Sequence, residues 1–278
     1  MTTLATAPQG GFGGALARTL SDGGTITWRN LMNIRRNPEL LLSATVQPIM
    51  FVLLFAYVFG GSIGDDPVAY RDFLMGGIFV QTVAFNSAFT VIGMANDLQK
   101  GIIDRFRSLP MSNSAVLLGR TLSDLAVTTL GLLVMSLCGL LIGWRIRGSV
   151  TDAVLAYLML LLFAFAMAWV GSLIALISGS VEVAQSAGFI WIFPVTFIST
   201  VFVAADRLPG PLQVFAEWNP ISALSDSVRS LFGNHQLLPP TDAWPQQNPT
   251  LYALISCVVL IAVFMPLAVS KYRKVAAK

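Results

Sequence analysis

Long apolar runs separated by short polar segments dominate the chain from about residue 38 to residue 270. A helix needs about 20 mostly apolar residues to cross a bilayer. Six stretches meet this requirement, at about 40–60, 73–94, 115–142 (or from Thr121), 153–177, 183–203 and 251–269. The pattern therefore predicts an all-α membrane protein, with a transmembrane domain of six helices in residues 38–270.

A charged interruption from Asn96 to Arg120 separates the second and third runs. Its first half has helical periodicity, since apolar residues recur at steps of three and four; these are Leu98, Ile102, Phe106 and Leu109. Asn96 with Gln99 suits an N-cap and capping box, and Pro110 prevents simple continuation. We therefore expect a short amphipathic helix at 97–109 on the membrane surface. The alternative is a solvated loop that only fixes the topology.

Residues 25–37 form a second amphipathic pattern, just before the first run. Trp28 and Leu31 lie on its apolar side, and Arg29 and Arg36 lie on its polar side. A basic helix with Trp on the apolar side is typical of the membrane interface. We expect an interfacial helix here, preceded by a flexible cytoplasmic tail at 1–24.

Residues 208–233, between the fifth and sixth runs, contain two half-apolar pieces separated by Asn219-Pro220. In the second piece, helical spacing places Asp226 and Arg229 outward. These pieces predict outer amphipathic helices that are re-entrant, lying at the outer leaflet or dipping into it.

Charge is scarce and unevenly distributed. Only 11% of the residues are charged, against about 25% in soluble domains. With both termini in the cytoplasm, twelve of the 17 Lys and Arg lie inside, including the basic tail at 271–278. This bias fixes the orientation, because positive charge concentrates in cytoplasmic loops. Trp144-Arg145-Ile146-Arg147, placed outside, is a local exception.

Candidate catalytic groups are few. The sequence has no G-x-x-x-x-G-K-[ST] phosphate loop, and its two cysteines lack metal-ligand spacing. The predicted spans are nearly free of ionisable side chains, which makes an intramembrane enzyme improbable. A net charge of +3 without a basic block gives no reason to expect nucleic acid.

Several spans carry uncharged polar side chains and many phenylalanines. Most of these residues are expected to pack helices together or face lipid. The functional alternative is an apolar pathway for a hydrophobic or amphipathic substrate. The candidates for such a pathway are Phe55, Gln81, Asn86, Phe89, Phe189 and Phe193.

The segment from Asp97 to Ser112, with its Leu109-Pro110 turn, resembles the region between spans two and three of type-2 ABC exporter permeases. The sequel at 117–124 and the outer stretch Glu217-Trp218-Asn219-Pro220 are also similar to that family. Within it, the chain looks most like the daunorubicin-resistance-type drug or lipid permeases. The resemblance covers roughly residues 25–270.

The resemblance implies a mechanism. Two such chains, identical or related, pair around a central pathway in the plasma or inner membrane, and two ABC ATPase subunits dock on the cytoplasmic face. ATP and Mg belong to the ATPase, so this chain is expected to bind no cofactor. The implied coupling residues are Asp97, Lys100, Asp104, Arg105, Phe106, Arg107, Arg29 and Arg36. The implied outer gate comprises Glu217, Asn219 and Pro220.

These expectations point to the permease subunit of an ATP-driven exporter of hydrophobic drugs or lipids, not itself an enzyme. Two alternatives remain at the level of sequence. One is a permease for glycolipid or polysaccharide export, and the other is a membrane scaffold that transports nothing.

Overall fold

Helices make up the fold throughout the ranges that the computed structural model describes, which are residues 32, 46, 49–54, 57, 67–101, 113–234 and 242–276. The long helices are α3 (Pro67–Gln99), α5 (Asn113–Leu141), α6 (Val150–Ile177), α7 (Val181–Phe197) and α11 (Pro249–Ala276). The short ones are the 3₁₀ helix η2 (Ala205–Arg207), α8 (Gly210–Glu217), α9 (Pro220–Leu231) and α10 (Trp244–Gln247).

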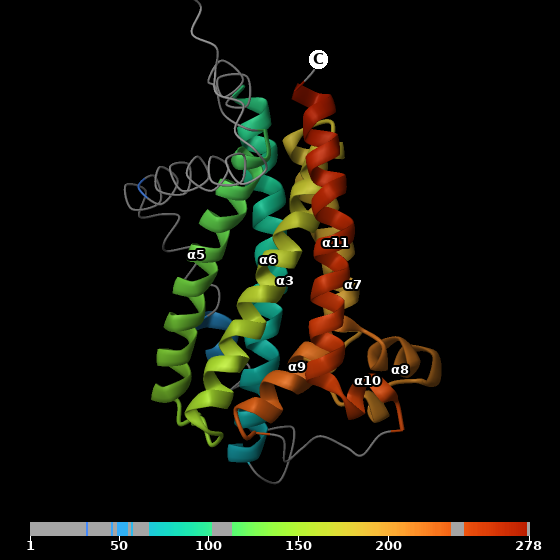
Figure 1. The fold of residues 1–278 in the computed structure, drawn as a ribbon. Coiled ribbons are helices and arrows are strands. Elements are labelled where there is room, and N and C mark those ends of the chain that lie inside the picture. Colours follow the sequence, from blue (N-terminus) through green and yellow to red (C-terminus); the bar gives the residue numbers. More distant parts are fainter. Residues whose placement is uncertain are drawn as a thin grey trace, which may run out of the picture.

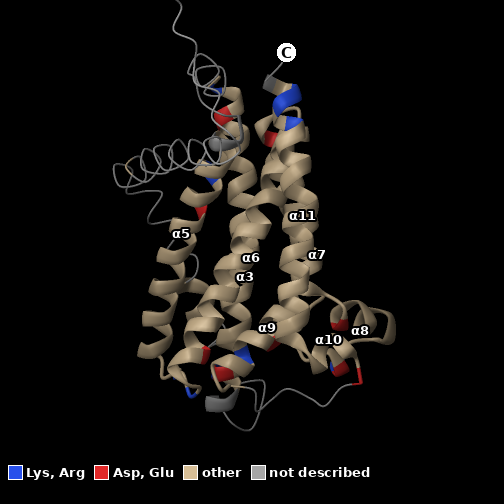
Figure 2. Cartoon of the chain, in the orientation of Figure 1, with Lys and Arg blue, Asp and Glu red and all other residues tan. Residues whose placement is uncertain are grey.

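The five long helices run side by side as a bundle with alternating directions (Figure 1). One end holds Gln99, the turn between α6 and α7, and Ala276; we call it the tail end. The opposite end holds the α5–α6 loop with α8, α9 and α10, and we call it the α9 end. Charged residues gather near these two ends, leaving the middle of the bundle uncharged (Figure 2).

Within the described ranges, four helices are long and apolar enough to cross a membrane: Tyr70–Gln99, Val116–Leu141, Val150–Ile177 and Pro249–Val275. They correspond to the predicted second, third, fourth and sixth spans. Most of the first predicted span, and the interfacial helix at 25–37 except residue 32, lie outside the described residues. The count of six spans therefore stays a prediction.

The fifth predicted span is shorter than expected. α7 has 17 residues and ends at Phe197, so its length is about 26 Å against a hydrocarbon core of about 30 Å. The prediction of a helix to Val203 is wrong, because Ile198 leaves helical geometry at φ −92° and ψ 62°. The carbonyl groups that this early end leaves without helical partners accept hydrogen bonds from side chains of α9 and its N-cap, as described below.

α3 runs through the position where a new helix was predicted to begin. Asn96 lies within α3, and its Nδ2 donates to the Ile92 carbonyl at 3.0 Å. The predicted N-cap is therefore wrong. The helix ends beyond Gln99 because Gly101 adopts φ +63°, the left-handed conformation that suits a helix C-terminus. The rest of the predicted coupling helix, residues 102–109, lies outside the described residues.

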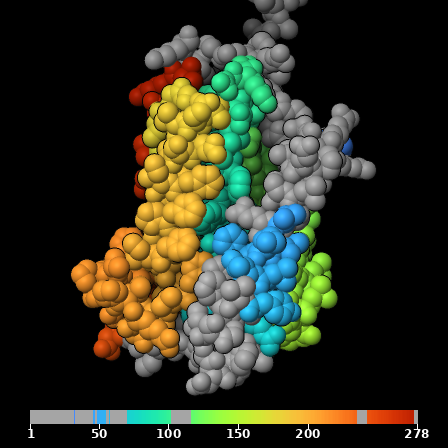
Figure 3. Space-filling view, turned by 180° about the vertical axis from the view of Figure 1, so that it is seen from behind, coloured from blue at the N-terminus to red at the C-terminus, as the bar shows by residue number. Residues whose placement is uncertain are grey.

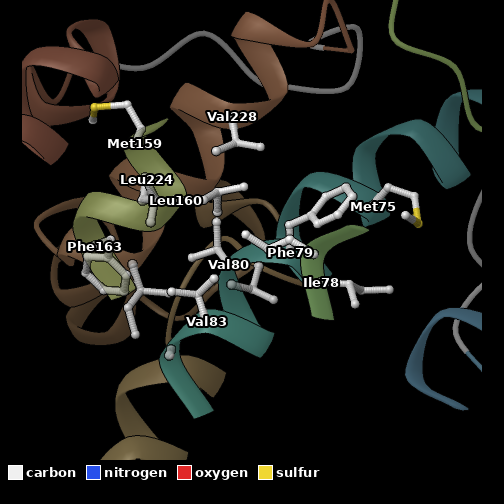
Figure 4. Packing of buried hydrophobic residues seen from close by; sticks show 14 of the residues in the cluster. Met75, Ile78, Phe79, Val80, Val83, Met159, Leu160, Phe163, Leu224 and Val228 are labelled. Carbon is white, nitrogen blue, oxygen red and sulfur yellow. The ribbon is translucent and has the colours of Figure 1, made fainter. Parts of the chain in front are cut away.

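α3 and α6 form the centre of the bundle, where small residues let their backbones approach closely. A Cβ atom on Gly171 of α6 would lie 2.6 Å from the Ser87 carbonyl oxygen of α3. Figure 4 shows the apolar core, to which α9 contributes Leu224 and Val228 beside Phe79 of α3 and Leu160 of α6. α9 is thus part of the core.

α5 and α11 expose rows of large apolar side chains instead. These include Leu130, Leu133, Leu137 and Leu140 on α5, and Leu254, Val258, Val259 and Val263 on α11. Such a surface suits lipid, since a soluble monomer rarely exposes contiguous apolar area of this extent.

Candidate functional site

Six phenylalanines contact one another in a series on α3, on α7 and just beyond α7, and Figure 3 shows α7 beside α3 on one face of the molecule. We call them the phenyl ladder; they are Phe85 and Phe89 of α3, Phe189, Phe193 and Phe197 of α7, and Phe202 beyond it. Ring centroids of successive members lie 4.9 Å apart for Phe85 and Phe193, 6.0 Å for Phe189 and Phe193, and 5.9 Å for Phe193 and Phe197. Phe197 and Phe202 close the series at 5.4 Å.

The phenyl ladder is open on one side. Phe89 is 44% exposed, Phe193 is 45% exposed and Phe197 is 52% exposed. Because ring faces and edges favour stacked or edge-on aromatic partners, this stripe can bind flat apolar ring systems without a polar anchor.

The sequence placed Phe89, Phe189 and Phe193 among the pathway candidates, and the structure brings these three together. The sequence-based pathway candidates did not include Phe85, Phe197 and Phe202. A spacing of four residues, on α3 and again on α7, was the available signal, because it aligns side chains on one helical face.

Of the polar pathway candidates, Asn86 bonds to another helix. The Asn86 Nδ2 donates to Thr128 Oγ1 of α5 at 3.1 Å, a hydrogen bond between two helices. Gln81 is buried on α3. Phe55 lies outside the described residues.

Asn219 joins two helices at the α9 end. It is buried, and its Nδ2 donates to the carbonyl oxygens of Val195 at 2.7 Å and Ile198 at 2.9 Å, where α7 ends. Its Oδ1 accepts from the Ile221 amide at 2.9 Å, which makes it the N-cap of α9.

The other two predicted gate residues flank Asn219. Pro220 is the first residue of α9, a position where its missing N–H costs nothing. Glu217 ends α8 and accepts from Gln213 Nε2 at 2.9 Å. The three predicted residues thus meet at the junction of α8 and α9.

Arg229 is the other anchor of this junction, and its side chain is fully buried. Its Nε donates to the Phe73 carbonyl, its Nη1 to the Thr200 carbonyl, and its Nη2 to the Val201 carbonyl, each at 2.8 Å. Nη1 also donates to Asp226 Oδ1 at 2.9 Å. The guanidinium carbon lies 3.6 Å from the centre of the Phe73 ring.

The prediction that Asp226 and Arg229 point outward is therefore wrong. Both side chains point into the molecule, because the polar side of α9 faces α3 and the segment after α7. Burial raises the pKa of Asp226 to about 6 and lowers that of Arg229 to about 10, and the attraction between the two groups opposes both shifts.

Further ion pairs tie the loops of the α9 end. Arg147 pairs with the buried carboxylate of Asp72, and Arg71 Nη1 donates to the Ile142 carbonyl at 2.7 Å. Trp144 is buried against Phe79 and Phe232. Trp144 and Arg147 thus attach the basic stretch at 144–147 to α3, while Arg145 and Ile146 are exposed.

At the tail end, Arg120 links the end of α3 to the start of α5. Its Nη1 lies 2.8 Å from Asp97 Oδ2, and its Nε lies 3.2 Å from Asp124 Oδ1. Gly93 leaves room for the guanidinium, since a Cβ there would lie 1.8 Å from Nη2. Asp97 is thus paired within the chain, while Lys100 is exposed beside it.

The remaining predicted coupling residues lie outside the described residues; they are Arg29, Arg36, Asp104, Arg105, Phe106 and Arg107. Over the ranges that the structure describes, no group of His, Cys, Asp and Glu is arranged to hold a metal ion.

Apolar helices with charge confined to their ends define a multi-pass helical membrane protein. The chain belongs to the ABC-2 type transporter family, whose model matches residues 23–232. The predicted resemblance to type-2 ABC permeases is thereby confirmed.

Several relatives are permeases. The chain is 31% identical over 261 residues to the daunorubicin resistance ABC transporter permease protein DrrB1 of Streptomyces coeruleorubidus, covering 92% of this chain and 88% of the relative. It is 24% identical over 217 residues to the probable doxorubicin resistance permease protein DrrC of Mycobacterium tuberculosis, covering 77% and 78%. The putative transport permease ycf38 of Cyanophora paradoxa is 22% identical over 214 residues, covering 76% and 73%. Family membership implies an ABC ATPase as the partner chain.

Proposed function

We propose that this chain is the permease subunit of an ATP-driven exporter that moves hydrophobic or amphipathic drugs or lipids out of the cytoplasm or the inner leaflet. The observation that carries the proposal is the phenyl ladder, an exposed stripe of aromatic rings along uncharged helices. Such a stripe offers apolar and ring-stacking contacts, and hydrophobic substrates need little else. The names of the drug-resistance relatives support the same substrate class.

In this proposal, ATP hydrolysis by a partner ATPase supplies the energy for transport. ATP and Mg are bound by two copies of an ABC ATPase, docked at the tail end of a pair of permease chains, which are identical or related. The tail end then faces the cytoplasm of a plasma or inner membrane. The basic side chains Lys271, Arg273 and Lys274 near the C-terminus support this orientation.

The tail-end contacts suggest how movement reaches the spans. The proposed coupling residues are Asp97, Lys100, Asp104, Arg105, Phe106, Arg107, Arg29 and Arg36. Because Arg120 bridges Asp97 of α3 and Asp124 of α5, force applied between Gln99 and Asn113 would act on both helices together.

The test is a pull-down of the partner ATPase, followed by ATPase measurements on the complex in lipid vesicles with increasing daunorubicin. We expect stimulation by the drug. Phe193→Ala should raise the KM for stimulation about fivefold, since an aromatic contact is worth about 0.5–1.5 kcal/mol. Phe215→Ala is the matched control, because Phe215 of α8 is exposed to a similar extent but lies outside the phenyl ladder.

Three outcomes would contradict the proposal. Stimulation by lipid-linked glycans and not by daunorubicin or phospholipid would favour glycolipid or polysaccharide export. Vesicles that hold the complex and ATP yet move nothing would favour a scaffold. Equal effects of Phe193→Ala and Phe215→Ala would remove the phenyl ladder from the pathway.

A further inference from the structure

The segment 198–204, which follows the early end of α7, is not helical, and its residues Ser199, Thr200 and Val201 are buried. Backbone carbonyls at such a place need partners, because neither lipid nor the apolar core supplies a donor. The carbonyls of Val195 and Ile198 accept from Asn219, and those of Thr200 and Val201 accept from Arg229. Two side chains of α9 thus replace the missing last turn of α7.

The position of Phe202 depends on this arrangement. Phe202 directly follows Thr200 and Val201, whose carbonyls accept from Arg229. Its ring completes the phenyl ladder, with its centroid 5.4 Å from that of Phe197. Gly77 of α3 makes the close approach possible, since a Cβ there would lie 2.1 Å from the Val201 carbonyl oxygen. The α-helix ends at Phe197, so α7 does not itself set the position of Phe202.

We propose that Arg229 is a positioning residue for the outer end of the substrate pathway: it fixes Thr200 and Val201 and thereby sets Phe202 against Phe197. The proposal rests on the proposed function, because it takes the phenyl ladder as the pathway. It also narrows the substrate class, since the relative position of these two rings, which are tilted by 32° to each other, matters to a substrate with a flat ring system and not to an alkyl chain.

An arginine is needed for this role. The guanidinium carries five donors in a planar fork, and here its three nitrogens reach four acceptors while its face lies on Phe73. Asp226 orients the fork, because its Oδ1 accepts both from Nη1 and from Thr200 Oγ1 at 3.0 Å. Lysine keeps the charge but has one ammonium group, so it cannot hold Phe73, Thr200 and Val201 together.

The experiment is a double-mutant cycle on the permease–ATPase complex in lipid vesicles. Arg229→Lys, Phe202→Leu and the double variant are compared by the KM and kcat of ATPase stimulation. The probes are daunorubicin, which has fused rings, and dodecyltrimethylammonium, an alkyl cation. Arg207→Lys is the control, because Arg207 is an exposed arginine at the same end of the molecule.

Each single variant is expected to raise the KM for daunorubicin about fivefold with kcat nearly unchanged. The double variant should be no worse than Phe202→Leu, because coupled residues are not additive. The KM for the alkyl cation should stay unchanged in all variants. Additive losses, or equal losses for both probes, would overturn the positioning role. Should Arg229→Lys not accumulate, Asp226→Asn disturbs the same guanidinium and is expected to give the same pattern.

A second measurement does not need transport. Phe202→Cys, in a chain whose Cys138 and Cys257 are replaced by alanine, is labelled with a membrane-impermeant maleimide, with and without Arg229→Lys. We expect labelling several-fold faster with Arg229→Lys and unchanged with Arg207→Lys. An unchanged rate with Arg229→Lys overturns the positioning role. Wild-type ATPase that responds to neither probe would instead overturn the proposed function and leave this labelling result valid.

Discussion

At the scale of the residue, Asn219 serves two helices with one amide group. Its Nδ2 donates to two carbonyl oxygens at the end of α7, and its Oδ1 accepts from the first free N–H of α9. Aspartate, serine and threonine are also good N-caps, but only an amide can donate and accept at the same time in this way. The site therefore selects asparagine for both of its roles.

Asn219→Ala should destabilise the protein by about 2–4 kcal/mol, because it leaves two buried carbonyls and one helix-start N–H without partners. Denaturant unfolding in detergent, followed by circular dichroism, measures the change. Asn248→Ala is the matched control, since Asn248 is exposed and its side chain donates one local hydrogen bond, to the Trp244 carbonyl. A loss no larger than that of the control would show that the two carbonyls find other partners.

Gly77 gives a second prediction at this scale. Gly77→Ala places a methyl group 2.1 Å from the Val201 carbonyl oxygen, a backbone atom that cannot rotate away. We expect a loss of stability of roughly 2 kcal/mol or more from this overpacking, read as a lower melting temperature of the purified chain. Gly179→Ala should have little effect, since nothing lies within 4 Å of its new Cβ. Equal melting temperatures would argue against the close approach of α3 to Val201.

The burial of Asp226 and Arg229 could not be predicted from periodicity. Helical spacing correctly placed the two on one side of α9, and a polar side normally faces water. Here the partners of that side are Phe73, Thr200 and Val201, which are 28 or more positions away in sequence. The spacing of one segment carries no information about such partners.

At the scale of the element, hydropathy predicted α5, α6 and α11 well, because a long uncharged run has few other ways to satisfy its backbone in a membrane. It failed where an element ends for a local reason. α7 stops early because Asn219 and Arg229 donate to the carbonyls at and just after its end. α3 continues past Asn96 because the next glycine that could end it is Gly101. Apolar content predicts where a membrane helix lies but not the residue at which it begins or ends.

α8 is an amphipathic helix whose apolar side is exposed. Leu212, Val214, Phe215 and Trp218 occupy one broad exposed side, opposite Gln213 and Glu217. Beyond it, Tyr252 packs edge-on against Trp218 and Trp244, and its hydroxyl donates to the Trp218 carbonyl at 2.8 Å. Tryptophan and tyrosine concentrate at membrane interfaces, so this group suits the boundary between acyl chains and headgroups.

We therefore expect Trp218 and Trp244 to be quenched by lipids brominated near the headgroup. The measurement is tryptophan fluorescence of a Trp28→Phe chain in brominated vesicles, compared with the same chain carrying Trp218→Phe and Trp244→Phe, which should lose most of the quenching. Trp144→Phe is the control, because Trp144 is buried and should not contribute to lipid quenching. Quenching by aqueous acrylamide alone would place α8 in water instead.

At the scale of the whole molecule, three arginines at the α9 end bind acceptors from other parts of that end. Arg147 pairs with Asp72, Arg229 pairs with Asp226, and Arg71 is held by the Ile142 carbonyl. The sequence predicted this basic outer stretch as an exception to the usual charge bias. The structure gives a reason for it, because these side chains are needed to join α3, the α5–α6 loop and α9.

The proposed coupling of ATP hydrolysis to transport is tested across the molecule. Reversing the charges of Asp104, Arg105 and Arg107 together should abolish export while the chain remains inserted, because the ATPase would bind the docking helix through complementary charges. Drug efflux from inverted vesicles, with the amount of membrane-bound permease as reference, measures the effect. Reversal of Asp206 and Arg207, at the α9 end, is the control. Unimpaired efflux after the triple reversal would remove these residues from the coupling role.

The connections of Arg229 also bear on the order in which the chain is made. Each of its partners, Phe73, Thr200, Val201 and Asp226, precedes it in sequence. Synthesis runs from the N-terminus, so the residues that carry these acceptors are already made when residue 229 emerges. α11 is synthesised afterwards, and its outward surface is mostly apolar and exposed. The buried cation can therefore be neutralised before the last helix enters the membrane.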